Sequence, residues 1–282
     1  MKFARVRHRA TVHLARIEDG HAVLLGAESD APRADVMIDA IATGARFDGD
    51  GTRVSLDDVD LLAPVRRPGK IIAIGLNYAS HADESAMELP RAPLLFSKPS
   101  SAIVGPNEPV RWKGTDCQEP DYEAELAVII GAPAAGSVDD PLRHVFGYTC
   151  CNDFSARDAQ FGDGQWVRGK SFDTFCPLGP WIVTPEEFGE PQDHAIGIDV
   201  TDPDGATVRL QDGHTSQMIF GVGEIITYIA RFITLEPGDV IATGTPAGVG
   251  FARTPKRFMN NGDVMTVWID GIGELTNPCV VV

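Results

Sequence analysis

The chain contains 282 residues, 43% of them hydrophobic, and has a formal charge of −16 at pH 7. This length allows one large domain, or one domain with a small appendage, and the composition is typical of globular rather than disordered proteins. A strongly acidic protein is a poor partner for nucleic acids and anionic membrane surfaces, so we expect neither. No run of about 18 apolar residues predicts a membrane span, and no apolar segment near the start predicts a signal peptide.

The cysteines indicate a reducing compartment. There are five of them, and their spacing fits neither zinc ligands nor a disulfide framework. We therefore expect free thiols in a cytoplasmic protein, with Cys150 and Cys151 packed in the core.

Residues 1–64 are expected to form a small β-rich N-terminal domain. Two stretches in this part, residues 10–17 and 21–27, alternate as half-buried strands do and are separated by turn residues. Residues 62–70, which read LAPVRRPGK, have the proline, glycine and charge content of a connector. The second predicted domain, residues 65–282, begins within this connector.

Most of the second domain is predicted to be β-structure. Its apolar stretches are short and are bounded by glycine, proline or aspartate, as is typical of β-rich folds. The predicted strands lie within residues 71–75, 93–99, 101–105, 123–131, 145–153, 179–185, 195–205, 239–250 and 263–282.

One long helix is expected to interrupt these strands at residues 214–233. Thr215 or Ser216 is a plausible N-cap, and the apolar residues that follow have helical spacing. These apolar residues are Met218, Val222, Ile225, Ile226, Ile229 and Phe232.

The stretch DYEAELAVII, residues 121–130, places two glutamates beside an apolar run. In a strand, Glu123 and Glu125 point to the same face, where their like charges repel. If the strand that ends at Asp153 lies beside them, the three carboxylates form a ligand set for a hard divalent cation such as Mg²⁺. Without such a neighbour, the two glutamates are an ordinary solvent-facing pair on an edge strand.

A second candidate group follows the predicted strand at 71–75. His81 and Glu84 are three residues apart in a short predicted helix, and therefore lie on one helical face. A carboxylate beside an imidazole orients the ring and raises its basicity, which makes this pair a candidate general base for deprotonating water. The alternative is an exposed pair on a surface helix.

Two further features contain groups suited to binding anions. Lys170 lies in a glycine-rich and aromatic-rich stretch shortly after Arg157 and Gln160, and a buried ammonium can bind a carboxylate or an enolate oxygen. Residues 243–250, TGTPAGVG, have glycines that allow backbone amides to approach an anion. A solvated surface lysine and a tight turn are the simpler alternatives.

Taken together, these motifs resemble those of the fumarylacetoacetate hydrolase family, from about residue 70 to the end of the chain. Seven motifs occur in the family's order, which makes the resemblance specific. They are GLNYASHADE, FSKP, YEAELAVIIG, NDFSARDAQ, KSFDTFCPLGPW, ITLEPGDVIATGTPAGVG and GIGELTNPCVVV. The N-terminal part resembles, more loosely, the small β domain of bacterial two-domain members.

The resemblance implies an α+β, β-rich fold, a mixed β-roll around a metal site, in a homodimer. It also implies roles for individual residues, and Leu76 departs from an arginine common in the family, which leaves the substrate open. The implied metal ligands are Glu123, Glu125 and Asp153, the catalytic residues are His81, Glu84 and Lys170, and the substrate contacts are Tyr78, Arg157, Gln160 and Thr245.

The activity implied is a Mg²⁺-dependent hydrolase that cleaves a C–C bond in a 2,4-dioxo acid of the acylpyruvate or fumarylacetoacetate type, as in aromatic catabolism. Mn²⁺ or Ca²⁺ is a possible substitute for Mg²⁺, and the reaction passes through an enolate. The alternatives are an oxaloacetate-type β-keto acid decarboxylase and an isomerase or lyase of a related 2-oxo acid. An alternative of another class is a non-catalytic dicarboxylate-binding protein that keeps the fold.

Overall fold

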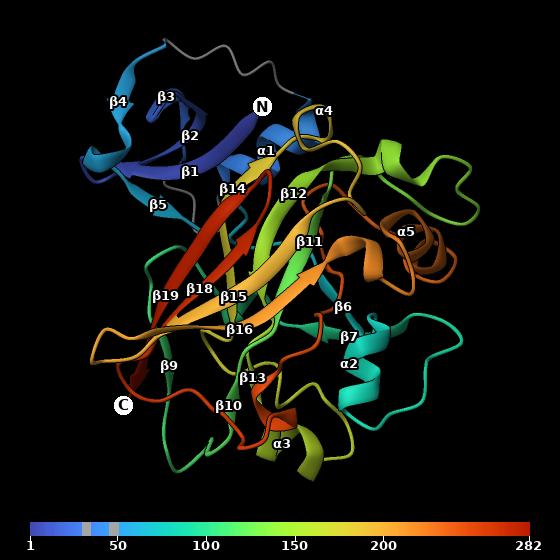
Figure 1. The fold of residues 1–282 in the computed structure, drawn as a ribbon. Coiled ribbons are helices and arrows are strands. Elements are labelled where there is room, and N and C mark those ends of the chain that lie inside the picture. Colours follow the sequence, from blue (N-terminus) through green and yellow to red (C-terminus); the bar gives the residue numbers. More distant parts are fainter. Residues whose placement is uncertain (30–34, 45–50) are drawn as a thin grey trace.

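The computed structural model describes residues 1–29, 35–44 and 51–282 of the chain. Within these residues, the strands form one large mixed sheet, a five-stranded sheet and a two-stranded ribbon, and the helices are short (Figure 1). The large sheet has the order β4-β3-β2-β1-β14-β12-β11-β17-β6-β7, with β5 beside β1 and β8 beside β14. The five-stranded sheet has the order β16-β15-β18-β19-β9, and β10 pairs with β13.

The strands of the large sheet are β1 (Lys2–His8), β2 (Thr11–Glu18), β3 (His21–Ala27), β4 (Arg53–Ser55), β5 (Asp60–Leu62), β6 (Ile71–Gly75), β7 (Leu94–Lys98), β8 (Ile103–Val104), β11 (Ala124–Ile130), β12 (Val145–Asn152), β14 (Cys176–Val183) and β17 (Val240–Ala242). The other strands are β9 (Val110–Trp112), β10 (Pro120–Asp121), β13 (Ser155–Ala156), β15 (Ala195–Thr201), β16 (Thr207–His214), β18 (Val264–Ile269) and β19 (Gly273–Val281). The α-helices are α1 (Val36–Thr43), α2 (Ala79–Glu84), α3 (Arg157–Gly162), α4 (Pro185–Phe188) and α5 (Val222–Ala230). Short 3-10 turns are η1 (Leu56–Asp58), η2 (Ser100–Ala102), η3 (Pro141–His144), η4 (Thr215–Gln217) and η5 (Gly250–Ala252).

The N-terminal strands continue the large sheet. β1 pairs with β2 and β5, and it also pairs with β14, through Lys2 opposite Val183 and Phe3 opposite Ile182. This part also contains helix α1, which the sequence patterns did not reveal. Asp35 caps α1 by accepting hydrogen bonds from the backbone N–H groups at the start of the helix.

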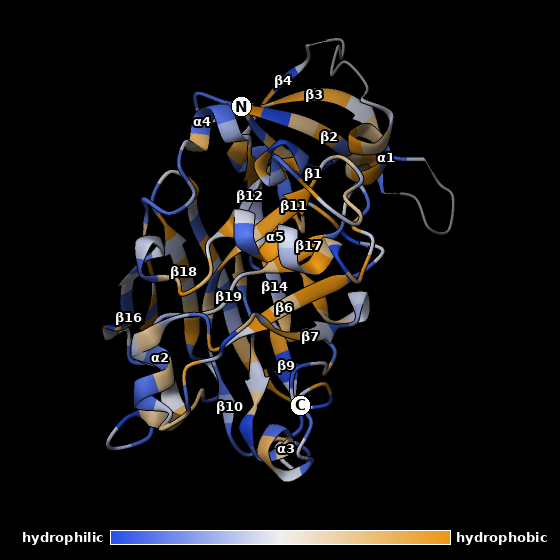
Figure 2. Ribbon diagram, turned by 90° about the vertical axis from the view of Figure 1, so that its right-hand side faces the viewer, coloured by the Kyte–Doolittle hydropathy of each residue, from blue (hydrophilic) through white to orange (hydrophobic). Residues whose placement is uncertain are grey.

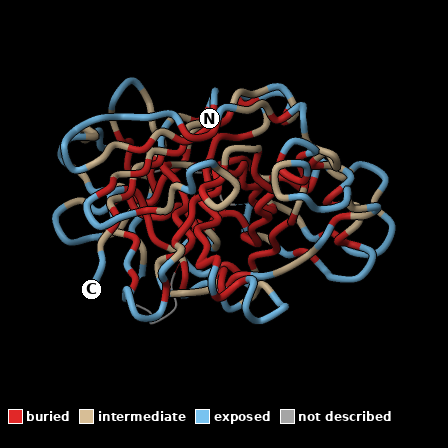
Figure 3. The backbone as a smooth tube through the Cα atoms, turned by 60° about the horizontal axis from the view of Figure 1, so that its bottom comes forward, coloured by how far each residue is buried: buried red, intermediate tan, exposed pale blue. Residues whose placement is uncertain are grey.

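Strand β11 forms the centre of the molecule, between β12 and β17. All seven of its residues are buried, and its apolar residues alternate between two apolar clusters. Leu126 and Val128 belong to the cluster covered by the five-stranded sheet and α5, whereas Ala127 and Ile129 belong to the cluster that includes β1, β14 and α1. The hydrophobic strands in the middle of Figure 2 and the buried backbone in the interior of Figure 3 show this core.

The helix predicted at residues 214–233 is too long. Helix α5 spans Val222–Ala230, and Thr215–Gln217 form the separate turn η4. Gly221 precedes the first turn of α5, and the side chain of Glu224 accepts a hydrogen bond from its backbone N–H at 2.9 Å.

Asn77 is the reason for the late start of α5. Its backbone carbonyl accepts a hydrogen bond from Ile219 N (2.8 Å), and its side-chain oxygen accepts one from Phe220 N (2.9 Å). A β-bridge between Tyr78 and Met218 extends the same contact. These tertiary hydrogen bonds keep residues 218–220 out of the helix, although their apolar spacing suits a helix.

The cysteines, the helix lengths and the positions of two helices complete the description of the fold. The five cysteines are buried and free, including Cys150 and Cys151 in the core. Among the helices described, none combines the length and apolarity needed to cross a bilayer. Helices α2 and α3 lie at the end of the molecule opposite the N-terminal strands (Figures 1 and 2).

Candidate metal centre and active site

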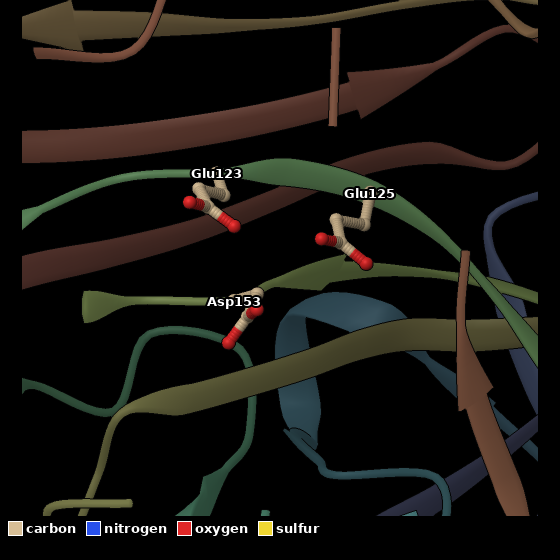
Figure 4. A group of neighbouring side chains, drawn as sticks. All are labelled: Glu123, Glu125 and Asp153. Carbon is tan, nitrogen blue, oxygen red and sulfur yellow. The ribbon is translucent and has the colours of Figure 1, made fainter. Parts of the chain in front are cut away.

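Three carboxylates meet where strands β11 and β12 lie side by side. Glu123 and Glu125 project from one face at the start of β11, and Asp153 directly follows β12 (Figure 4). All three are buried, and one oxygen of each lies within 4.8 Å of the others. The structure therefore brings the predicted metal ligands together.

The register of these two strands sets this geometry. Ala124 lies opposite Asn152, and Asp153 N donates a hydrogen bond to Glu123 O at 2.9 Å. The Asn152 side chain accepts a further hydrogen bond from Glu123 N at 2.9 Å. The Asn152 side chain thus holds the backbone at Glu123, the first residue of the glutamate pair, in place.

Two buried lysines neutralise part of this negative charge. Lys170 Nζ lies 2.7 Å from Glu123 Oε2 and 2.7 Å from Asp153 Oδ2, so one ammonium bridges two carboxylates. Lys98, which the sequence analysis did not select, lies 2.6 Å from the other Asp153 oxygen and also donates to a backbone carbonyl.

Arg157 provides the third cation. Its Nη2 lies 2.7 Å from Glu123 Oε1, and its Nε donates to Asp121 Oδ2 at 2.8 Å. A third nitrogen, Nη1, donates to Gln160 Oε1 at 2.9 Å, which positions the Gln160 amide. Asp121 is buried and accepts backbone hydrogen bonds from Gly250 and other residues. These hydrogen bonds fix the Asp121 carboxylate, which in turn holds the Arg157 guanidinium in place.

The pKa values show where charge is left uncompensated. Burial alone raises the pKa of Glu123, but Lys170 and Arg157 outweigh it, and the net shift is strongly downward. Burial raises the pKa of Glu125 well above its usual range, and the negative charges of Asp153 and Glu123 raise it further. Glu125 accepts a hydrogen bond from the backbone, but it has no ion pair within the described residues.

A divalent cation fits this site. Four carboxylates (Asp121, Glu123, Glu125 and Asp153) and three cations (Lys98, Arg157 and Lys170) are buried together, which leaves one negative charge in excess. Carboxylate oxygens are the donors that Mg²⁺, Mn²⁺ and Ca²⁺ prefer, and a dication relieves the repulsion that raises the pKa of Glu125.

The predicted His81–Glu84 pair is present on helix α2. His81 Nδ1 lies 2.8 Å from Glu84 Oε1, and His81 is buried whereas Glu84 is half-buried. The other Glu84 oxygen accepts a hydrogen bond from Gly248 N at 2.8 Å. Because a carboxylate can only accept here, Nδ1 carries a proton, and in the neutral form of the ring the lone pair is on Nε2.

Backbone amides of the glycine-rich segment 243–250 donate hydrogen bonds to carboxylate side chains of the protein itself. Gly244 N donates to Glu125 Oε2 at 2.9 Å, and Gly248 N donates to Glu84 as described above. Both glycines have a φ angle in the left-handed region, 98° and 108°, which a residue with a side chain rarely adopts. The amides that the sequence analysis assigned to an anion therefore serve one carboxylate of the triad and one of the dyad.

A pocket beside these groups contains most of the predicted site residues. His81, Glu123, Glu125, Arg157, Gln160, Lys170 and Thr245 line it. Asp153 lies behind Lys170, and Glu84 lies behind His81. Tyr78 is the exception: it is fully buried and does not line the pocket, so a direct substrate contact by its side chain has no support in this structure.

Most of the remaining pocket wall is apolar, and no sequence motif indicated it. Its apolar lining is Ile74, Leu76, Met87, Phe96, Phe161, Trp166 and Phe251. Phe251 stacks against the Arg157 guanidinium at 4.5 Å, and Phe161 packs against Phe251 at 5.3 Å. Aromatic residues on separate elements have no spacing signal in the sequence, so only the fold reveals that they converge.

Comparison with known proteins identifies the family. The sequence profile of the fumarylacetoacetate (FAA) hydrolase C-terminal domain matches residues 70–280. The chain belongs to the fumarylacetoacetate hydrolase family. A second profile, described as Rv2993c-like, N-terminal, matches residues 1–64.

Relatives with different activities belong to this family. The mitochondrial oxaloacetate tautomerase fahd2 of Xenopus laevis is 44% identical over 230 residues, which cover 80% of this chain and 70% of that protein. The 2,4-didehydro-3-deoxy-L-rhamnonate hydrolase of Sphingomonas sp. (strain SKA58) is 44% identical over 213 residues, 74% of this chain and 73% of that protein.

A solved structure supports the fold over the whole chain. Maleylpyruvate hydrolase from Sphingobium sp. SYK-6, solved with manganese(II) ion and pyruvate, has a TM-score of 0.80 and 30% identity, and the match covers 100% of this chain and 99% of that one. The predicted family and the predicted β-rich α+β fold are thus confirmed. The chain is an enzyme of the family, which removes the non-catalytic binding protein from the alternatives.

Proposed function

We propose that this enzyme is a divalent-metal-dependent hydrolase that cleaves a C–C bond in a 2,4-dioxo acid of the acylpyruvate class. The observation that carries the proposal is the pocket in which the carboxylate triad, the His81–Glu84 dyad and Lys170 meet. A triad alone fits many metal sites, whereas a general base beside it fits activation of water.

Glu123, Glu125 and Asp153 would hold the ion, for which Mg²⁺ is the proposed occupant and Mn²⁺ or Ca²⁺ are substitutes. When bound, such an ion supplies a Lewis acid that draws electron density from the oxygens of the substrate. The manganese in the maleylpyruvate hydrolase structure supports a metal of this kind.

His81 is the proposed general base. Its Nδ1 donates to Glu84, so Nε2 has the lone pair that takes a proton from water. Glu84 is itself held by Gly248 N, which keeps the ring orientation constant while the proton moves. The water oxygen then bonds to the carbonyl carbon at position 4 of the dioxo acid.

Cleavage of the bond between carbons 3 and 4 completes the reaction. The electron pair of that bond passes to the pyruvate half as its enolate, and the carboxylic acid of the acyl half leaves. The proton held by His81 returns to carbon 3, which gives pyruvate, so atoms and charges balance. The Lys170 ammonium stabilises the enolate oxygen as negative charge develops there.

The pocket provides both polar and apolar contacts for this substrate. Arg157, Gln160 and Thr245 provide donors for the carboxylate and the adjacent oxo group. The aromatic wall, which includes Trp166 and Phe251, offers apolar contact for the acyl group. An apolar wall of this kind is not needed for oxaloacetate, which is small and has two carboxylates.

Tautomerisation of oxaloacetate is the second candidate. It is favoured by the relative that is 44% identical and named as an oxaloacetate tautomerase. This reaction moves a proton through the same enolate and needs no attack by water, and a decarboxylase or isomerase of a 2-oxo acid shares this feature. His81 and Lys170 would then exchange the proton and stabilise the enolate.

A substrate panel tests the proposal. The purified protein is assayed with Mg²⁺ on acylpyruvates, fumarylpyruvate, 2,4-dioxo sugar acids and oxaloacetate, with pyruvate release and loss of the oxaloacetate enol as separate readouts. We expect pyruvate from acylpyruvates, a decrease of roughly 10²–10⁴-fold in kcat for His81→Ala, and full activity for the control His8→Ala. Enol loss without pyruvate release from any dioxo acid would establish the tautomerase instead.

The proposal includes a homodimer. β7 is the last strand of the large sheet, and its outer edge has no strand partner among the described residues. Beside it, an apolar groove contains Leu94, Leu95 and Ile233. An open edge next to exposed apolar side chains favours pairing with a second copy. Light scattering after gel filtration gives the molar mass, and Leu94→Lys is expected to shift the mass from dimer to monomer.

A further inference from the structure

Gln211 has a buried side chain that connects two parts of the site. It lies on β16, outside every motif considered above, and is 1% exposed. Its Oε1 accepts a hydrogen bond from Ala124 N at 2.9 Å. Its Nε2 donates to Thr245 Oγ1 at 2.7 Å and to Pro246 O at 2.7 Å.

Two backbone groups fix the orientation of this amide. The N–H of Ala124 can only donate, so it must face the amide oxygen of Gln211. The carbonyl of Pro246 can only accept, so it must face the amide nitrogen. A flipped amide would place two donors together at Ala124 and two acceptors together at Pro246, and both contacts are buried.

The orientation of the amide determines the polarity of Thr245. Because Nε2 is the donor in this contact, the Thr245 hydroxyl oxygen is the acceptor. The hydrogen of that hydroxyl has no acceptor among the hydrogen bonds of the described residues, and Thr245 lines the pocket. The hydrogen is therefore available to an oxygen of a bound ligand.

We propose that Gln211 is a positioning residue that makes Thr245 a hydrogen-bond donor toward the pocket, and so selects a ligand with an acceptor oxygen, such as a carboxylate, at that place. The inference rests on the proposed function for the identity of that ligand, a 2-oxo acid. Neutral threonine hydroxyls can donate or accept, and the buried amide removes this freedom.

The same amide keeps Thr245 in register with the carboxylate triad. Ala124, whose N–H binds Gln211, stands between Glu123 and Glu125 in the chain. Gly213, two residues after Gln211, packs so closely on Pro246 that a Cβ there would lie 2.6 Å from its ring. The segment with Thr245 is thus held against β16, and the donor and the triad keep a constant spacing.

The test measures binding of pyruvate to the Mg²⁺-loaded protein by calorimetry, and so does not depend on turnover. In Gln211→Glu, the shape and the contact with Ala124 N are kept, whereas the hydrogen bond to Pro246 O is lost. The new carboxylate accepts from the Thr245 hydroxyl and draws its hydrogen out of the pocket. We expect Kd for pyruvate to rise about tenfold. Thr245→Val, which removes the hydroxyl, is expected to give a similar rise.

A double-mutant comparison separates polarity from the added charge. In the Thr245→Val background, Gln211→Glu should raise Kd no further, whereas in the Thr245→Ser background, which keeps a hydroxyl, the full rise should return. A rise of equal size in both backgrounds means that the charge itself is responsible, and overturns the proposal. Gln217→Glu, an exposed change beyond the end of β16, is the matched control and should leave Kd unchanged.

Thermal unfolding with Mg²⁺ verifies that each variant is folded and loaded. An unchanged Kd in folded Gln211→Glu overturns the inference even if the wild type hydrolyses acylpyruvates. Pyruvate binding that follows the expected pattern without any hydrolysis leaves the inference standing and refutes the hydrolase. A wild type that does not bind pyruvate refutes both.

Discussion

Replacing Glu125 with glutamine should stabilise the metal-free protein and destabilise the metal-loaded one. Glutamine has the shape of glutamate, and its side-chain oxygen can still accept the hydrogen bond from Gly244 N. It removes one of the three negative charges that face one another. The sign of the effect therefore depends on whether a cation is bound.

The structure sets the size of the effect. Two unit charges 4.8 Å apart repel by about 3.5 kcal/mol at an effective dielectric constant of about 20. Glu125 has two such neighbours, Glu123 and Asp153, and the Lys170 ammonium offsets part of the repulsion. We expect a net gain of about 2 kcal/mol for Glu125→Gln without metal, which raises Tm by roughly 4 °C for a chain of this size.

The stability gained by Glu125→Gln without metal should increase as pH rises. The pKa of Glu125 is raised in the folded protein, so the folded state holds a proton that the unfolded state has lost. The wild type therefore loses stability as pH rises above the unfolded pKa, and glutamine cannot show this loss. The advantage of Glu125→Gln in EDTA should be small at about pH 5 and largest at about pH 8.

Metal reverses the order of stability. An ion present at about 100 times its Kd adds about 2.7 kcal/mol to the wild type, or roughly 5 °C in Tm. Glu125→Gln keeps only two of the three carboxylate ligands and should gain much less at the same Mg²⁺ concentration. Scanning calorimetry of both proteins, in EDTA and in Mg²⁺, measures whether the order of their Tm values reverses.

Two results would refute this reasoning. The first is a lower Tm for Glu125→Gln in EDTA at about pH 8, because the repulsion would then be absent. The second is an equal Mg²⁺-induced shift in both proteins, because Glu125 would then not be a ligand. Glu274→Gln, an exposed change on β19, serves as the charge-matched control and should alter neither quantity.

Three further substitutions, together with one glycine control, test the packing and the role of Tyr78. In Gly75→Ala, the new Cβ would overlap the Trp166 ring, so we expect a loss of about 1–3 kcal/mol and a changed tryptophan fluorescence. Gly250→Ala would press on the backbone carbonyl of Arg257 and should lower Tm similarly, whereas Gly26→Ala, with open space around it, should not; equal effects would contradict the packing described. Tyr78→Phe removes a buried hydroxyl that has no hydrogen-bond partner among the described residues, so stability should stay constant or rise by about 1 kcal/mol, with KM unchanged; a large rise in KM would restore Tyr78 as a substrate contact.

The sequence revealed those site features that depend on local spacing. Glu123 and Glu125 converge because a strand repeats every two residues, and His81 meets Glu84 because a helix brings residues three apart together. Asp153 could be proposed as their partner only on the condition that its strand lies beside theirs, since no local rule shows that β12 ends beside β11.

Contacts between distant segments were beyond sequence reasoning. Lys98 binds Asp153 across 55 residues of chain, and Gln211 binds Thr245 across 34. Lysine and glutamine are usually surface residues, so the residue types at these two positions gave no indication that their side chains are buried. The overlong helix at 214–233 has the same cause, because hydrogen bonds from Asn77 decide where α5 begins.

The pairing of β1 with β14 has a practical consequence for expression of the catalytic part alone. β1 covers part of the edge of β14, through Lys2 and Phe3, and β14 is a neighbour of β12 in the sheet that carries Asp153. A fragment that starts at residue 65 would uncover this strand edge together with the apolar side chain of Ile182. Unpaired apolar edges recruit other chains, so such a truncation should aggregate rather than give a smaller enzyme.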